Sequence, residues 1–334
     1  MAGNPEWLAQ VKEEALEPER PIVDPHHHLW DRPDSRYELD ELLADTGSGH
    51  NIRATVFIEC GSMYEASATP AMAPLGETEY VNGIAAKSAS GVFGETRIAA
   101  GIVGFADLTL GDAVDEVLEW HMLRAPERFR GIRHANAHDD SPEIREAHTR
   151  PPKGLLSHDD FRKGFARLEQ KEMTFDAWLF HPQIPELTDL ARAFPNTTII
   201  LDHFGGPLGI GPYEGKRAEI FEQWKKDIHE LASCPNVAAK LGGINMAVNS
   251  FGWHKRPMPP TSDDLVDATR DWYLYTIDAF GPMRCMFESN FPVDKLSCSY
   301  GVLWNAFKKI AKDFSEDEKT ALFHDTAKRV YRLD

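Results

Sequence analysis

Asp24, His26 and His28 are spaced two residues apart, directly after the short apolar run at positions 21–23. Such a run is typical of a buried parallel strand. Side chains two apart in an extended chain share a face, so His26 and His28 should project side by side where the strand ends. Neutral imidazole binds zinc, manganese and iron, so the spacing predicts the start of a metal site. The alternative is a cluster of partly exposed histidines with ordinary hydrogen bonds; His27 should face away and pack.

Other predicted strands end in residues that could complete such a site. Arg133 follows one of them and could hold a substrate carboxylate or carbonyl oxygen, or form an ion pair at the rim. His181 and His203 end the next two strands. Histidines at the ends of three strands indicate a metal or proton-transfer centre. Lys240, near the end of a later strand, is either a partner for a substrate carboxylate or part of a salt bridge.

The last predicted strand supplies carboxylates. Glu288 and Asn290 share a face by the period of two, and Asp294 lies just beyond Pro292. Hydrolysis needs a group that accepts a proton from water and returns it to the leaving group. Glu288 and Asp294 are both candidates for this general base. Asn290 cannot take up a proton at neutral pH and is expected to bind substrate.

Eight apolar, strand-like runs alternate with helix-like segments along the chain. The runs are 21–24, 54–60, 98–103, 129–134, 175–180, 197–202, 237–241 and 285–289. This alternation over 334 residues predicts a (β/α)8 barrel, an α/β fold that typically takes ~250 residues. An open doubly wound sheet is the rival, but it usually carries a glycine-rich turn after its first strand, and here that turn is rich in histidine. Ser315 and Glu318 form a capping box that should open a last helix.

We expect residues 1–20 to form an acidic leader and residues 21–334 to form one domain. Long connections follow the second, fourth and seventh predicted strands, at 61–74, 136–157 and 242–262. In a barrel all three lie on the C-terminal face, where barrel enzymes place their sites. The last connection contains Trp253, which could stack on a substrate. The three connections are either lids over a site or decoration.

The composition excludes several classes of partner. A net charge of −17 argues against nucleic acid and anionic membrane surfaces as partners. Four cysteines without metal-like spacing fit free thiols in a reducing compartment. The first 20 residues show no apolar core of a signal peptide, and no run is long enough for a membrane helix. We therefore expect a cytoplasmic protein that acts on a small molecule, and a homodimer is possible.

These motifs together resemble the amidohydrolase superfamily, and within it the amidohydrolase-related branch that holds 2-pyrone-4,6-dicarboxylate lactonase and sugar-acid lactonases. The resemblance spans about residues 20 to 332 and implies a (β/α)8 barrel. His26 and His28 match its first-strand pair, and His181 matches its fifth-strand histidine. Related proteins bind zinc or manganese there, whereas some lactonases of the branch use no metal. Asn290 stands where the family usually has Asp.

The resemblance implies three hypotheses. In the first, the protein hydrolyses lactones or related carboxylate-bearing compounds. His26, His28 and His181 then bind one divalent ion or line the carbonyl pocket, Arg133 holds the substrate, His203 stabilises the oxyanion, and Glu288 or Asp294 activates water. In the second, the protein is a metal-dependent decarboxylase of an aromatic or enoic acid. In the third, suggested by Asn290, the barrel binds a small molecule without turning it over.

Overall fold

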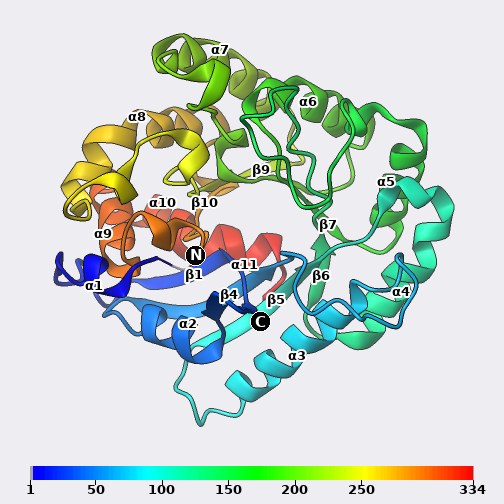
Figure 1. Cartoon of the computed structure of the whole chain (residues 1–334), viewed down its shortest axis with the longest axis horizontal. Coiled ribbons are helices and arrows are strands. Elements are labelled where there is room, and N and C mark those ends of the chain that lie inside the picture. The colour runs from blue at the N-terminus through cyan, green and yellow to red at the C-terminus, as the bar shows by residue number, and fades with distance from the viewer. Residues whose placement is uncertain (1–2, 334) are drawn as a thin grey trace.

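The computed structural model describes residues 3–333, and its centre is a sheet of eight parallel strands with helices around it (Figure 1). The strands are β1 (Pro21–His27), β4 (Asn51–Ile58), β5 (Arg97–Gly104), β6 (Phe129–Ile132), β7 (Thr174–Ala177), β8 (Ile199–Leu201), β9 (Val237–Leu241) and β10 (Cys285–Phe287). Each pairs with the next along the chain, and a single bridge from His27 to Phe291 links the two ends of the sheet. A doubly wound sheet would reverse its strand order at a switch point. The fold is therefore a nearly closed (β/α)8 barrel, as predicted.

All eight predicted strands are present, although several end earlier than the apolar pattern indicates. A small antiparallel hairpin, β2 (Trp30–Arg32) with β3 (Ser35–Tyr37), was not predicted. The helices are α1 (Pro5–Leu8), α2 (Leu39–Thr46), α3 (Leu75–Ala89), α4 (Val114–Arg124), α5 (Asp159–Gln170), α6 (Ile184–Ala193), α7 (Arg217–Ala232), α8 (Ser262–Phe280), α9 (Tyr300–Ile310), α10 (Glu316–Thr320) and α11 (Thr326–Val330). The predicted capping box of Ser315 and Glu318 opens α10, and a wider turn at Ala321–Asp325 separates α10 from α11.

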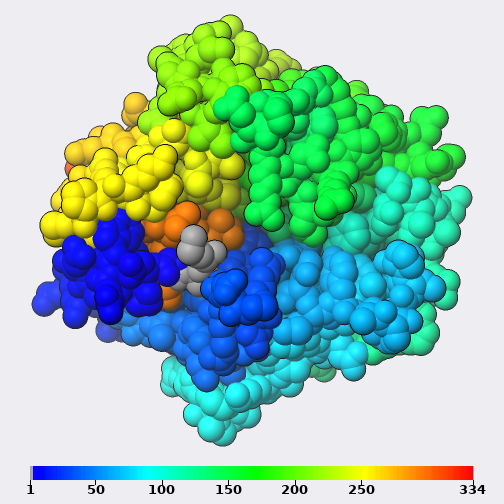
Figure 2. Space-filling model, in the orientation of Figure 1, coloured from blue at the N-terminus to red at the C-terminus, as the bar shows by residue number. Residues whose placement is uncertain are grey.

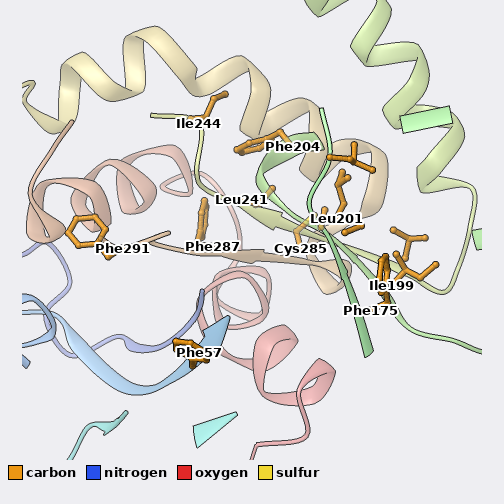
Figure 3. Packing of buried hydrophobic residues seen from close by; sticks show 14 of the residues in the cluster. Phe57, Phe175, Ile199, Leu201, Phe204, Leu241, Ile244, Cys285, Phe287 and Phe291 are labelled. Carbon is orange, nitrogen blue, oxygen red and sulfur yellow. The ribbon is translucent and has the colours of Figure 1, made fainter. Parts of the chain in front are cut away.

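Alternate residues of the strands face two different clusters of apolar side chains. The outward residues pack against the surrounding helices; among them are Phe57, Phe175, Leu201, Leu241 and Phe287 (Figure 3). The inward residues form a second cluster with the C-terminal residues of the chain; its members include Val23, Val56, Ile200, Ala238, Met286, Val330 and Tyr331. The C-terminal segment therefore fills the barrel interior. Because the side-chain period of a strand is two, the next inward positions toward the strand ends belong to the site.

The N-terminal residues lie against later parts of the chain. Trp7 in α1 donates a hydrogen bond to the carbonyl of Arg256, in the connection after β9. The Lys308 ammonium donates to the carbonyls of Leu16 and Glu17. In Figure 2 the blue N-terminal region accordingly abuts the yellow region of the surface. No helix within residues 3–333 is long and apolar enough to cross a membrane.

Candidate active site

His26 and His28 both reach the barrel interior at the end of β1. Parallel pairing with β4 is interrupted between Asp24 and His27, and this irregularity sets the direction of the two rings. Their Nε2 atoms lie 3.3 Å apart, and both side chains are buried. Burial lowers the pKa of His26 and of His28 well below the ordinary value, with nearby cations adding to the effect. Both rings are therefore neutral at pH 7, the state in which imidazole binds metals.

The neighbours of this pair have structural contacts of their own. Asp24 accepts hydrogen bonds from the backbone N–H of Ser289 and the hydroxyl of Tyr300, so it ties β1 to the end of β10. Burial raises the pKa of Asp24 to about 6. The Nε2 atom of His27 lies 2.8 Å from the Thr55 hydroxyl, and its ring packs on Phe57, in agreement with the packing role expected for it.

Glu288, just after β10, lies between two imidazoles. Its Oε1 is 2.6 Å from Nδ1 of His203, and its Oε2 is 2.8 Å from Nδ1 of His26. The Glu288 carboxylate fixes the proton of His203 on Nδ1 and leaves its Nε2 as the reactive nitrogen. Nδ1 of His26 also lies 3.2 Å from the Lys240 ammonium, which can only donate a hydrogen bond. The Nε2 atom of His203 has no hydrogen-bond partner among the described residues. The His203 ring also packs against Trp178 from the end of β7, with centroids 5.0 Å apart.

A buried ionic layer lies on the inward face next to these groups. The Lys240 ammonium is 2.5 Å from Asp176 and 3.1 Å from Asp202, and all three side chains are fully buried. Burial alone would lower the pKa of Lys240, but the two carboxylates raise it, so the lysine is charged. For Lys240 the structure therefore favours the salt bridge over contact with substrate. Tyr331, from the C-terminus, donates a hydrogen bond to Asp176 from the barrel interior.

Arg133 leaves the end of β6 and enters the same cluster. Its Nε donates a 2.8 Å hydrogen bond to Oε1 of Glu59, at the end of β4, and its Nη2 donates to the Glu59 carbonyl. Its Nη1 lies 3.5 Å from Nε2 of His26. On the far side, Oε2 of Glu59 is 2.9 Å from Nε2 of His148, in the long connection after β6. Burial would raise the pKa of Glu59, but Arg133 and His148 lower it to about 2.

The donor set fits a divalent cation. Donor atoms of His26, Asp202 and His203 all lie within 4.8 Å of one another. Within residues 3–333, both carboxylate oxygens of Asp202 are buried and lack a hydrogen bond, although the Lys240 ammonium lies 3.1 Å from Oδ1. Two nitrogens bound to one tetrahedral zinc are about 3.4 Å apart, which matches the spacing of His26 and His28. The Nδ1 atom of His28 lies 2.8 Å from the Ile58 carbonyl, so its Nε2 is also left free.

Some predicted site residues lie elsewhere. The His181 ring accepts a hydrogen bond from the Leu208 backbone and packs on Tyr213; it is not among the donors grouped around His26. Trp253 is buried within its own connection, where its indole N–H donates to Asn245. The ligand role of His181 and the substrate contact of Trp253 therefore stay predictions.

Asn290 and Asp294 lie together beyond β10. The amide of Asn290 donates a 3.1 Å hydrogen bond to Oδ1 of Asp294, while Oδ2 of Asp294 has no partner. Burial raises the pKa of Asp294 to about 7, against the opposing effect of nearby His203. Asp294 thus differs from Glu288, because both Glu288 oxygens face imidazoles. Both remain candidates for the general base.

Four members of the cluster were not assigned a role from the sequence. Glu59, Asp176 and Asp202 are acidic residues within or directly after apolar strands, which is an energetically costly placement unless each has a partner. That signal was available in the sequence. His148 is 16 residues from the end of β6 in a connection without regular structure, and its contact with Glu59 depends on how the backbone folds back. No sequence period predicts such a contact.

Comparisons with known proteins agree with this geometry. The profile of a family described as amidohydrolase matches residues 23–333. An uncharacterised protein of Sinorhizobium fredii is 35% identical, over 93% of this chain and 98% of its own length. An L-fucono-1,5-lactonase of Burkholderia multivorans is 27% identical, over 93% of this chain and 96% of the lactonase. The crystal structure of an amidohydrolase from Burkholderia multivorans with bound zinc is 25% identical, superposes with a TM-score of 0.71, and covers 94% of this chain and 99% of its own.

Proposed function

The chain belongs to the amidohydrolase family and is a hydrolase, and we propose that it opens a lactone by attack of water at the ring carbonyl. The observation that carries this proposal is the buried pair of His203 and Glu288, with the Arg133 guanidinium 3.5 Å from the neighbouring His26. A carboxylate that orients an imidazole, next to a cationic group for a carbonyl oxygen, is the equipment that hydrolysis of an ester bond requires. The lactonase among the relatives supports the same substrate class.

The residues divide the work as follows. Arg133 binds the carbonyl oxygen and stabilises the negative charge that develops on it during attack. Nε2 of His203 takes a proton from the attacking water, and Glu288 stabilises the resulting imidazolium through Nδ1. The bond between the carbonyl carbon and the ring oxygen then breaks, and His203 returns the proton to that oxygen. The product is an open-chain hydroxy acid.

A divalent ion would be held by His26 and His28, with Asp202 as the carboxylate donor. When bound, zinc or manganese polarises a carbonyl or lowers the pKa of water. Nδ1 of His26 faces Glu288 and the Lys240 ammonium, whereas its Nε2 lies 3.3 Å from Nε2 of His28, so the two Nε2 atoms are the nitrogens placed to share an ion. The donors that lie within 4.8 Å of one another are those of His26, Asp202 and His203. In this scheme His28 takes the place of His203 as a ligand, because Nε2 of His203 serves as the proton acceptor.

The test is an assay of the purified protein on a panel of aldonic acid lactones and 2-pyrone carboxylates. Hydrolysis is measured as the release of acid into a weakly buffered indicator solution. Hydrolysis should proceed with incorporation of one oxygen atom from labelled water into the acid. Release of carbon dioxide without such incorporation would instead indicate a decarboxylase. Tight binding of a lactone with no product, with or without added zinc or manganese, would indicate a binding protein and contradict the proposal.

Three further features belong to this proposal. We place the enzyme in the cytoplasm, because its four cysteines are free and none within the described residues pairs with another. We treat residues 21–334 as one catalytic domain with residues 1–20 as a leader. A homodimer is one possible assembly, which light scattering coupled to gel filtration would test.

A further inference from the structure

The connection after β6, residues 133–157, extends over the face of the barrel where the site lies. The ring of His148 lies against Glu59 and Gly61, which directly follow β4. Asp139 accepts a 2.7 Å hydrogen bond from the hydroxyl of Tyr213, in the connection after β8. Gln183, after β7, donates a hydrogen bond to the carbonyl of Asn136. The segment therefore touches connections that follow three other strands of the barrel.

The site beneath this segment is closed. Arg133 is 5% exposed and His203 is 2% exposed, while His26 and Glu288 are fully buried. These side chains have little contact with solvent, so separation of a neighbouring segment would make them more accessible to a substrate. Among the residues that make these contacts, His148 lies at the surface, with 37% of its side chain accessible to solvent. His148 is thus a solvent-accessible contact between this segment and the buried Glu59.

Glu59 contacts both the Arg133 side chain in the site and His148 at the surface. One carboxylate oxygen accepts the hydrogen bond from Nε of Arg133, and the other pairs with Nε2 of His148. We propose that Glu59 is a positioning residue that holds the Arg133 guanidinium in the site with one oxygen and latches the 133–157 segment through His148 with the other. Closure of the segment and correct placement of Arg133 then depend on the same side chain.

The charges explain why this carboxylate suits both tasks. Glu59 is fully buried and faces Arg133 and His148, with the buried Glu77 nearby as a second acid. Two neighbouring cationic groups offset the energetic cost of burying a carboxylate charge. Loss of either cation leaves part of that cost without compensation. The Glu59 carboxylate raises the pKa of His148 despite partial burial, which favours the charged form of the latch. Separation of His148 therefore weakens the environment that fixes Arg133.

Limited digestion with trypsin tests the latch without reference to catalysis. Arg145 and Lys153 lie on either side of His148 and are exposed, so cleavage there reports opening of the segment. His148→Ala and Glu59→Gln should each speed cleavage by about three- to fivefold, the range of a partly exposed ion pair. The double variant should be cleaved no faster than the faster single variant, because both changes remove the same contact. His148→Gln keeps a hydrogen-bond donor opposite Glu59 without adding a trypsin site and should be cleaved more slowly than His148→Ala.

His158→Ala is the matched control, since His158 lies just beyond the segment and its side chain makes no hydrogen bond or ion pair among the described residues. Its cleavage rate should equal that of the wild type. A wild-type rate for His148→Ala, or effects of the two single variants that multiply in the double variant, would overturn the latch. If Glu59→Gln does not fold, His148→Ala and His148→Gln still decide the question, because the side chain of residue 148 is at the surface.

The positioning of Arg133 is tested by kinetics and rests on the proposed lactonase function. Both His148→Ala and Glu59→Gln should lower kcat for the lactone more than they raise KM, because Arg133 acts on charge that develops during attack, and His148→Arg should restore kcat. Unchanged kcat in both variants, with faster trypsin cleavage, would show a latch without coupling to Arg133 and overturn the joint role of Glu59. If the wild type hydrolyses no lactone, the proposed function is wrong. The digestion experiment still tests the contact between His148 and Glu59 independently of that result.

Discussion

Nδ1 of His203 lies 2.6 Å from Oε1 of Glu288, and both side chains are buried in the barrel. The two residues are 85 positions apart in the chain, yet parallel strands deliver them to the same edge. The contact settles which ring nitrogen of His203 carries a proton when Glu288 is ionised, because a carboxylate only accepts hydrogen bonds. The second ring nitrogen is then free to accept a proton from water. The pair therefore has the form of a base and its orienting group.

The first prediction concerns this pair. Glu288→Gln removes the charge that stabilises the imidazolium, and His203→Asn removes the proton acceptor. Each should lower kcat for the lactone by about 10²–10⁴-fold, the usual contribution of general base catalysis. The double variant should lose no more than the worse single variant, because the residues act as a unit. Full turnover by Glu288→Gln would remove Glu288 from the reaction and leave Asp294 as the candidate.

The second prediction concerns the metal. Protein purified without added metal should contain about one zinc or manganese per chain by elemental analysis, and His26→Ala and His28→Ala should each abolish it. His27→Gln is the matched control, because the His27 ring contacts Thr55 and Phe57 and not the other two rings. His203→Asn should keep the metal and lose turnover. No metal in the wild type, and no uptake from supplied zinc or manganese, would contradict this ligand set.

The sequence predicted the barrel and much of the site for a simple physical reason. The apolar period of a buried strand and the polar residues at its end are both local, so positions such as His26, His203 and Glu288 could be identified without knowing the fold. The contacts that these side chains make with residues on other strands could not be identified in this way. Asp176 interrupts an apolar strand, but its pairing with Lys240 depends on how two strands are placed around the barrel. The contact of His148 with Glu59 likewise depends on an irregular connection.

The third prediction uses the pKa of Asp294, which burial raises to about 7 from an ordinary value near 4. Between these pH values the folded chain holds a proton that the unfolded chain has lost, so Asp294 lowers the free energy of unfolding as the pH rises from about 4 to 7. Asp294→Asn removes this titration, and its melting temperature should rise relative to the wild type at pH 8 but not at pH 4. If turnover also falls at least 100-fold, Asp294 is the base; unchanged turnover would assign that role to His203 and Glu288.

The fourth prediction concerns Asn136, which is fully buried while both polar atoms of its side chain lack a partner. A buried amide without partners costs about 1–3 kcal/mol, so an apolar replacement of similar size should stabilise the fold. Asn136→Leu should raise the free energy of unfolding by about 1 kcal/mol in urea titration. The same variant should raise KM if the amide serves the substrate, since Asn136 lies three residues after Arg133. Loss of stability would show that the amide has a structural partner.

The last prediction concerns the ionic layer, in which Lys240 compensates Asp176 and Asp202. Lys240→Met leaves two buried carboxyl groups without their cation and should lower the free energy of unfolding by about 3–5 kcal/mol. Burial already raises the pKa of Asp176 to about 6, and loss of the lysine, which opposes that shift, should raise it further. When a carboxyl group has a raised pKa in the folded state, the free energy of unfolding of the protein falls as the pH rises. The deficit of the variant should therefore be larger at pH 8 than at pH 5. Tyr331→Phe, which removes one hydrogen bond to Asp176, should cost about 1–3 kcal/mol. A deficit for Lys240→Met that is equal at both pH values would contradict the role of Lys240 as the charge partner of these carboxylates.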